Sequence, residues 1–275
     1  MQLDNVTTWC NTDVLQAWEA RSRRAGNRLE GVMIKSFPSE INHVLHDWQI
    51  QSLMSCLSGG DSLHVLDIGC GYGRVSQAIL RSRSNFHCVG MDLAHNYARQ
   101  FSKQEASCRA AQAQIPDIPF EDSAYDVVLA VGVLGYMATK PAQRLALKEM
   151  LRVLKPGGRC LLITEEPGGR RLWSLGGSLR WLGCIAGRGK GTENMDHVTI
   201  KLSNLRNLIE ATGGEILSQK GCPILTASLP FLIGMSLTGS KMVASITRSC
   251  LALDRALGDR PAPSIYTVSE IVPRR

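Results

Sequence analysis

The sequence predicts an α/β fold built on a doubly wound, mostly parallel, seven-stranded sheet with a helical N-terminal lid and helical cap insertions. From residue 63 onward, short apolar runs typical of buried parallel strands alternate with segments of helical periodicity. The first of these runs leads directly into a glycine-rich turn. The length of 275 residues and a hydrophobic content of 44% suit one sizeable globular domain with modest additions.

Residues 1–60 are expected to form the helical lid. Thr12 or Asp13 can cap a first helix that runs through Arg24. A second helix is expected to begin near Ser39, because apolar residues recur there at helical spacing.

Residues 61–275 are expected to form the sheet domain. The predicted strands lie at residues 63–69, 86–92, 108–111, 125–133, 159–166, 213–221 and 264–272. The predicted helices between them lie at residues 73–82, 96–105, 141–154 and 203–211. Two cap insertions, at about 167–197 and 223–260, interrupt this alternation, which otherwise predicts parallel strand connections.

Charge is spread unevenly along the chain. Residues 1–137 carry 11 basic and 14 acidic residues, a net charge of −3, whereas residues 138–275 carry 20 and 10, a net charge of +10. A basic half fits an anionic partner such as a phosphate-bearing substrate, RNA or an acidic membrane surface. It equally fits a solvated basic face with no dedicated partner.

The nine cysteines are scattered singly, with no CxxC pair and no Cys/His cluster at metal-ligand spacing. This pattern predicts reduced thiols, a cytoplasmic location and no metal site. The N-terminal residues are mixed and acidic, unlike a signal peptide. The longest apolar stretch, Ile224 to Leu237, contains Pro230 and is too short to span a bilayer.

The most informative segment runs from Asp67 to Arg74 and reads DIGCGYGR. Its glycines fall at a predicted strand-to-helix turn, where a missing Cβ permits positive φ and lets the backbone approach a ligand. A GxGxG pattern alone fits NAD-binding folds and ligand-free turns as well. The pattern therefore indicates a nucleotide-type site without identifying its ligand.

Two acidic residues narrow the choice of ligand. Asp67 directly precedes the glycine turn and is a poor neighbour for a pyrophosphate, which prefers bare amides and a helix N-terminus. Asp92 ends the next strand, 25 residues later, where a carboxylate can accept both ribose hydroxyls. S-adenosylmethionine has no phosphate but carries both an ammonium group and a ribose, so the two acids favour it.

The segments VLDIGCGYGR, VGMDLA, IPFEDSAYDVVLAVGVL and LRVLKPGGRCLLITE resemble, in this order, the motifs of class I S-adenosylmethionine-dependent methyltransferases. The resemblance covers about residues 60–220 and implies a Rossmann-like fold, with S-adenosyl-L-methionine as cofactor and S-adenosyl-L-homocysteine as product. The cofactor-binding residues that it implies are Asp67, Gly69, Cys70, Gly71, Gly73, Asp92, Leu93, Gln114, Ile115 and Val131.

Within this set the resemblance implies separate roles. Asp67 holds the methionine end of the cofactor, Asp92 holds the ribose and Leu93 lies against the adenine. Gln114 stands where the family often has an acidic residue, which leaves its contact with the adenine amino group open. Val131 lies near the methionine moiety, although a simple core position is the alternative for both Val131 and Leu93.

Methyl transfer requires alignment of the acceptor with the methyl–sulfur axis and exclusion of water, and a base only if the acceptor keeps its proton. The sequence contains no decisive base. Candidates are His197 and Tyr136, for which a structural role is the alternative, and His43 and His46 on the second lid helix.

The acceptor is predicted to be a small or lipid-like metabolite, methylated at oxygen, because both cap insertions are rich in apolar residues. One alternative is an RNA or protein methyltransferase that uses the basic half, although no recognisable RNA-binding module is present and nucleic acid is not expected. A second alternative is a nicotinamide-dependent dehydrogenase or a non-catalytic nucleotide binder. Residues 238–258 carry an apolar stripe that either packs on its own domain or belongs to a peripheral membrane contact through residues 223–258.

Overall fold

The computed structural model describes residues 12–34, 37–57, 62–83, 85–104, 108–167, 197–239, 241–261 and 264–274. The cap insertion predicted at 167–197 lies outside the described residues except at its two ends. The first residues of the predicted lid, up to residue 11, also lie outside them.

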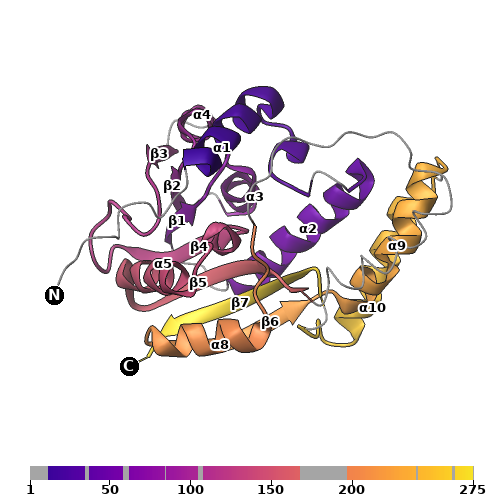
Figure 1. Cartoon of the computed structure of the whole chain (residues 1–275). Coiled ribbons are helices and arrows are strands. Elements are labelled where there is room, and N and C mark those ends of the chain that lie inside the picture. Colours follow the sequence, from indigo (N-terminus) through magenta and orange to yellow (C-terminus); the bar gives the residue numbers. More distant parts are fainter. Residues whose placement is uncertain are drawn as a thin grey trace.

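Seven strands form one sheet in the order β3-β2-β1-β4-β5-β7-β6 (Figure 1). Their bounds are β1 His64–Ile68, β2 His87–Asp92, β3 Arg109–Gln112, β4 Tyr125–Val131, β5 Leu154–Glu165, β6 Gly214–Gly221 and β7 Tyr266–Pro273. The pairs from β3 to β5 are parallel, whereas β7 runs antiparallel to both β5 and β6. The prediction of a mostly parallel seven-stranded sheet is confirmed.

Eight α-helices and two short 3-10 helices are present in the described part of the chain. The α-helices are α1 Thr12–Ala25, α2 Ser39–Cys56, α3 Arg74–Ser82, α4 His95–Phe101, α5 Lys140–Arg152, α8 Leu202–Ala211, α9 Pro223–Leu237 and α10 Val243–Ala256. The 3-10 helices are η1 Leu29–Gly31 and η2 Leu134–Tyr136. None of the described helices combines the length and apolar character that crossing a membrane requires.

The largest differences from the predicted bounds lie in β5 and α4. β5 begins at Leu154, five residues before the predicted start, because Leu154 already pairs with Tyr125 before the register shifts. Gly157, with φ +81°, lies between Leu154 and Arg159, the two β5 residues that pair with β4 on either side of this shift. α4 ends at Phe101, four residues before the predicted end at residue 105.

Alternating side chains of the parallel strands build a hydrophobic core on each face of the sheet. In β4, Val127 and Leu129 belong to the cluster that contains α2, α3, α9 and α10, whereas Val128 and Ala130 belong to the cluster that contains α5 and α8. Because both faces are covered, these strands are apolar at successive positions instead of alternating. The described cysteines, seven in number, are all buried free thiols.

The N-terminal helices pack in different places. α1 lies beside α4, where the Asn96 side chain donates to Ser22 Oγ at 3.2 Å and the Tyr97 hydroxyl donates to the Gly31 carbonyl at 2.9 Å (Figure 1). α2 is instead part of the core, with Leu45 and Trp48 almost fully buried. The chain between the two helices therefore passes the carboxyl ends of the central strands.

Candidate cofactor site

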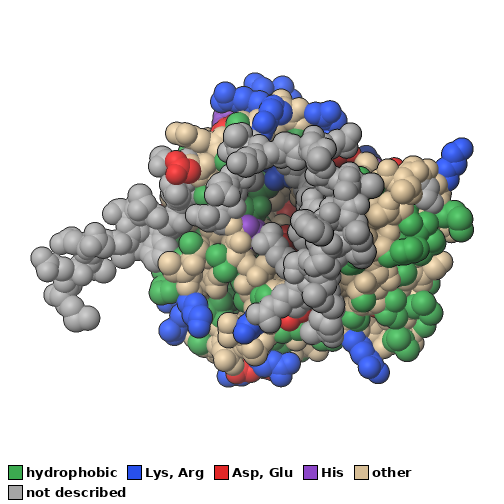
Figure 2. All heavy atoms as spheres, turned by 45° about the vertical axis from the view of Figure 1, so that its right-hand side comes forward, with side chains coloured by type: hydrophobic (Ala, Val, Ile, Leu, Met, Phe, Trp, Pro, Cys, Tyr) green, Lys and Arg blue, Asp and Glu red, His purple; other side chains and the backbone are tan. Residues whose placement is uncertain are grey.

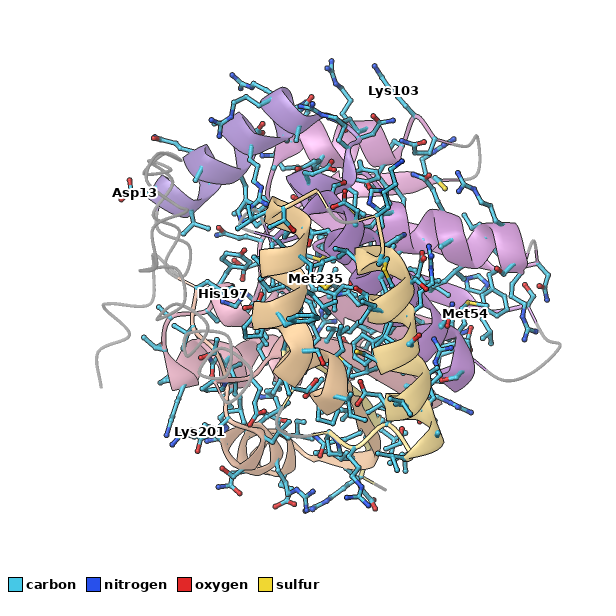
Figure 3. All side chains as sticks on the ribbon, turned by 90° about the vertical axis from the view of Figure 1, so that its right-hand side faces the viewer. Asp13, Met54, Lys103, His197, Lys201 and Met235 are labelled. Atoms are coloured by element: carbon cyan, nitrogen blue, oxygen red, sulfur yellow. The ribbon has the colours of Figure 1, made fainter. Side chains whose placement is uncertain are left out.

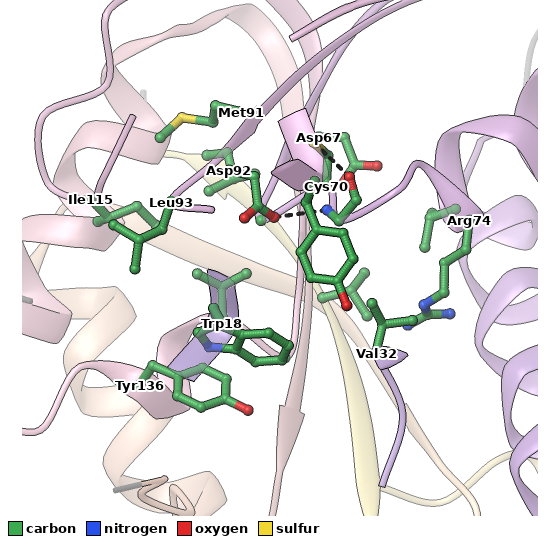
Figure 4. A pocket seen from close by; sticks show the side chains of 18 of the residues that line it. Trp18, Val32, Asp67, Cys70, Arg74, Met91, Asp92, Leu93, Ile115 and Tyr136 are labelled. Carbon is green, nitrogen blue, oxygen red and sulfur yellow. Dashed lines mark hydrogen bonds between the residues drawn. The ribbon is translucent and has the colours of Figure 1, made fainter. Parts of the chain in front are cut away.

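A cavity of about 310 Å³ lies at the carboxyl ends of β1, β2 and β4 (Figure 4). The space-filling view shows the hollow in the surface of the molecule (Figure 2). Strand ends form its floor, and α1, residues 32–34 and residues near η2 form its walls. Ligands of open parallel sheets bind at this edge because it lies outside the carboxyl ends of the strands.

The glycine turn forms one wall of the cavity. Gly69 and Gly71 line it with φ values of +67° and +55°, in the left-handed region that favours glycine. A Cβ on Gly69 would collide with Val133, so the missing side chain also creates space. Gly73 does not line the cavity; a Cβ there would stand 2.9 Å from Phe101, so this glycine permits α3 to pack beside α4.

Asp67 is the penultimate residue of β1 and lines the cavity with 2% of its surface exposed. Its Oδ2 accepts a hydrogen bond from Ser76 Oγ at 2.7 Å. Burial raises the pKa of Asp67 to about 6, against the lowering effects of the Ser76 hydrogen bond and the Arg74 charge. A cationic group entering the cavity would therefore find a carboxylate that lacks solvation.

Asp92 lies at the end of β2, on the other side of the glycine turn (Figure 4). Its Oδ2 accepts from the Gly71 amide and its Oδ1 from the Ala94 amide, both at 2.8 Å. Burial raises its pKa to about 6 as well. A carboxylate has about four acceptor positions, so two remain for a pair of hydroxyls.

The remaining predicted cofactor residues also line the cavity. Cys70, Leu93, Gln114, Ile115 and Val131 are all among its lining residues. Leu93 and Ile115 lie together near Met91 and Asp92, on the opposite side of the pocket from Arg74 (Figure 4). The cavity thus has an apolar end beside Asp92 and a charged end beside Asp67.

Arg74, the last residue of the DIGCGYGR segment, lines the cavity, although the sequence did not predict it as a site residue. Its Nη1 donates to His46 Nδ1 and its Nη2 donates to Gln49 Oε1, both at 2.8 Å. Both partners are uncharged, since burial and the Arg74 charge lower the pKa of His46 to about 4. The guanidinium charge therefore faces the cavity without a carboxylate among these partners.

The four candidate bases separate into two groups. His46 does not line the cavity and is bound to Arg74, and His43 is exposed with its Nδ1 2.8 Å from the Ser39 carbonyl oxygen. His197 and Tyr136 both line the cavity. Their rings are in edge contact, with 4.9 Å between the ring centroids. The structure thus brings only the second pair to the cavity.

His197 is held in place by its surroundings. Its Nδ1 lies 3.7 Å from Oε2 of Glu165, at the end of β5, and each side chain is only 12% exposed. The amide of Val198 donates to the Gly135 carbonyl at 2.7 Å and fixes the adjoining backbone. Trp18 of α1 packs edge-on against Tyr136 at 5.4 Å, so α1 closes this side of the cavity (Figure 4).

Sequence reasoning missed several lining residues. They are Val14, Trp18, Arg21, Val32, Met33, Ile34, Gln49, Arg74, Glu165 and Tyr266, together with a few neighbours of the predicted ones. Arg74 and Glu165 carry a usable signal, because one directly follows the glycine turn and the other is the penultimate residue of a predicted strand. The α1, α2 and β7 residues carry none, because only tertiary packing brings them to the cavity.

Among the residues that the structure describes, no cluster of three or more His, Cys, Asp or Glu side chains is arranged to hold a metal ion.

Residues 65–158 match the family model described as "Methyltransferase domain". The human protein named "Probable tRNA methyltransferase 9B" is 33% identical over 98 residues, which are 36% of this chain and 20% of that protein. The Caenorhabditis elegans "Sterol 4-C-methyltransferase strm-1" is 34% identical over 108 residues, which cover 37% of this chain and 31% of that protein. The chain thus spans between a fifth and a third of these relatives.

A solved structure of similar fold is that of 1,6-didemethyltoxoflavin-N1-methyltransferase from Burkholderia thailandensis, which has S-adenosylhomocysteine bound. It superposes with a TM-score of 0.56 at 14% identity, covering 96% of this chain and 89% of that one. Asp67, Gly69, Gly71 and Asp92 all belong to the matched segment, and all four line the cavity. The chain therefore carries a methyltransferase domain at residues 65–158, within a Rossmann-like fold.

Proposed function

We propose that the protein is an S-adenosylmethionine-dependent methyltransferase that methylates a small or lipid-like acceptor at oxygen. The observation that carries the proposal is the meeting of Asp67, Asp92 and the glycine turn at one cavity. Two buried carboxylates on either side of bare backbone suit a ligand with a positive charge and a diol.

The residues at the cavity fit the cofactor group by group. Asp67 suits the ammonium group, Arg74 the carboxylate of the same amino-acid end, and Asp92 the ribose hydroxyls. Leu93 and Ile115 offer an apolar slot for the adenine. When bound, the cofactor supplies a methyl group activated by the positive sulfonium charge.

The acceptor side is supported by the wall that α1 and residues 32–34 form. Val14, Trp18, Met33 and Ile34 make this wall largely apolar, and ligand pockets with such walls take molecules that bury most of their surface. α1 and the aromatic contacts of Tyr136 exclude water from this side. Alignment without water is the main requirement of the transfer.

Methylation at oxygen is supported by the Glu165–His197 pair. An imidazole with a carboxylate near its Nδ1 can take a proton at Nε2, which in this structure lies against Gly135. In the proposed reaction, His197 accepts the hydroxyl proton of the acceptor and Glu165 stabilises the resulting imidazolium. Tyr136, packed on the same ring, positions it.

A second candidate acceptor is RNA. The net charge of +10 in residues 138–275 and the likeness to a protein named as a tRNA methyltransferase favour it. Binding through phosphate contacts weakens steeply with salt, so a gel shift repeated at rising salt separates this candidate from a small acceptor.

The test is incubation of the protein with methyl-labelled S-adenosylmethionine and cell extract separated into lipid, small aqueous, RNA and protein fractions. We expect label in the lipid or small aqueous fraction. Label in RNA or protein alone would overturn the proposed acceptor class, and label in no fraction would overturn the proposed activity. An Asp92→Ala sample, incubated in parallel, identifies label that arises from contaminating enzymes.

A further inference from the structure

The outer surface of the α9–α10 hairpin carries large apolar side chains that do not pack on the protein. Phe231, Leu237 and Met242 are 64%, 54% and 63% exposed. These three residues, called the apolar tip below, lie on the C-terminal half of α9 and in the turn that leads to α10. Figure 2 shows a patch of apolar side chains on the side of the molecule that α9 and α10 form, in the same view as the hollow.

α9 differs from an ordinary surface helix. Its sequence, PILTASLPFLIGMSL, contains no charged residue. Leu225, Leu229 and Leu232 are fully buried and account for the face that packs on the core. The opposite face of a surface helix is normally polar, but here it bears Phe231 and Leu237. Packing on the core therefore explains the apolar residues on one face of α9 but not those on the exposed face.

The exposed charges of the hairpin have one sign. Residues 223–253 contain Lys241 and Arg248, both exposed, and no Asp or Glu. The next acidic residue, Asp254, is buried, and its carboxylate accepts from the amides of Ile224 and Leu225 at 2.8 and 3.0 Å. The Asp254 carboxylate is therefore bound by backbone amides inside the hairpin and adds no negative charge to its exposed surface. Glu40 of α2, which accepts from Ser236 Oγ at 3.5 Å, lies beside the tip.

α10 and α9 pack side by side, so the basic and apolar residues share one structural unit (Figure 3). An exposed apolar patch marks an interaction site, and its chemistry indicates the partner. Exposed aromatic and aliphatic side chains with flanking Lys and Arg suit an interface that is apolar inside and anionic outside. A bilayer with anionic headgroups has that structure.

Two other occupants fit less well. A nucleic acid would pair with Lys241 and Arg248 but would leave Phe231, Leu237 and Met242 against phosphates and water. A second copy joined by a two-fold axis would bring the same surface together and place like charges near each other. The bilayer satisfies both the apolar tip and the two cations.

We propose that the α9–α10 hairpin is a peripheral membrane-binding element that inserts the apolar tip into the interfacial region of an anionic bilayer. Lys241 and Arg248 then lie at headgroup level, and their aliphatic stems continue the apolar surface. The proposal concerns where the protein binds and does not depend on the methyl-transfer reaction. It also places the cavity near a source of lipid-like molecules.

The test uses the full chain and sedimentation with vesicles of phosphatidylcholine, with or without about 30 mol % phosphatidylserine. We expect binding to the anionic vesicles that weakens with salt. Each cation near such a surface strengthens binding about fivefold, so Lys241→Glu with Arg248→Glu should weaken it at least about 25-fold. Phe231→Ser with Leu237→Ser should weaken it at least about tenfold, through lost apolar burial.

Matched controls come from the same classes of exposed side chain elsewhere. Leu217 on β6 is 55% exposed, and Arg81 on α3 is also exposed, so Leu217→Ser and Arg81→Glu should leave vesicle binding unchanged. Circular dichroism and S-adenosylhomocysteine binding check that the tip variants are folded. These controls distinguish a loss of vesicle binding caused by the altered tip from one caused by unfolding of the protein.

Three results would overturn the proposal: no binding of the wild-type protein to anionic vesicles, equal weakening by the control variants, or binding that the tip variants retain. Light scattering after gel filtration adds a further arm. A stable dimer that Phe231→Ser converts to a monomer would assign the apolar tip to self-association instead.

Discussion

Asp92 Oδ2 accepts a hydrogen bond from the backbone amide of Gly71 at 2.8 Å, so the acid that ends β2 is joined directly to the glycine turn that follows β1. The two halves of the candidate cofactor site are therefore one rigid unit. A second bond, from the Ala94 amide to Oδ1, fixes the orientation of the carboxylate.

Asp92→Ala is expected to weaken S-adenosylhomocysteine binding at least about 30-fold, because hydrogen bonds to a charged group contribute about 1.5–3 kcal/mol each. Isothermal titration calorimetry measures the change. Asp126→Ala is the control: this aspartate lies near the start of β4 and binds the His64 amide and Lys155 Nζ, away from the cavity. Unchanged affinity in Asp92→Ala would contradict the ribose assignment.

Arg74→Gln is expected to weaken S-adenosylhomocysteine binding about tenfold or more, through loss of a charge-assisted bond to the amino-acid carboxylate. Binding of 5′-methylthioadenosine, which lacks the amino-acid end, is expected to be unchanged. Competition of both ligands with a fluorescent nucleoside measures the two affinities in one format. An equal loss for both ligands would show that Arg74 acts on the fold of the site and not on that carboxylate.

Asp67 should make the ligand-free protein less stable as the pH rises. Its pKa is about 6 in the folded protein against an ordinary value of 3.8, so the folded state holds a proton that the unfolded state releases. The contribution of Asp67 to stability is therefore highest below about pH 4 and falls until about pH 6; two pKa units correspond to about 3 kcal/mol at most.

Asp67→Asn removes this titration. We expect its free energy of unfolding to exceed that of the wild type by about 1–3 kcal/mol near pH 7.5 and to match it near pH 4. Urea unfolding at the two pH values measures both. A variant that is less stable than the wild type at the higher pH would show that the carboxylate is not penalised by burial.

His197→Asn is expected to lower kcat by about 10²–10⁴ with little change in KM, because only proton removal from the acceptor is lost. His95→Asn is the control, since this histidine does not line the cavity. An unchanged kcat in His197→Asn would show that this histidine is not the base.

Much of the fold was predictable because strand and helix periods are local properties of the sequence. The buried runs at β1, β2 and β4 are apolar at consecutive positions, and each is followed by a glycine, an acid or a polar loop. The antiparallel direction of β7 was not predicted, since the direction of a strand depends on the chain that precedes it. α9 and α10 were predicted only as one helical segment.

The candidate site was predictable where its residues belong to one strand end or turn. Asp67, Gly69 and Asp92 stand at such ends, and all three line the cavity. Gly73 fits the same motif, yet it serves helix packing instead. Trp18, Gln49 and Tyr266 come from distant elements, and nothing in their local sequence indicates that tertiary packing places them at the cavity.

The most direct measurement is calorimetric titration of the wild-type protein with S-adenosylhomocysteine and, separately, with NAD. The account predicts saturable one-to-one binding of S-adenosylhomocysteine, lost in Asp92→Ala, and no saturable binding of NAD. Saturable binding of NAD with none of S-adenosylhomocysteine would contradict it.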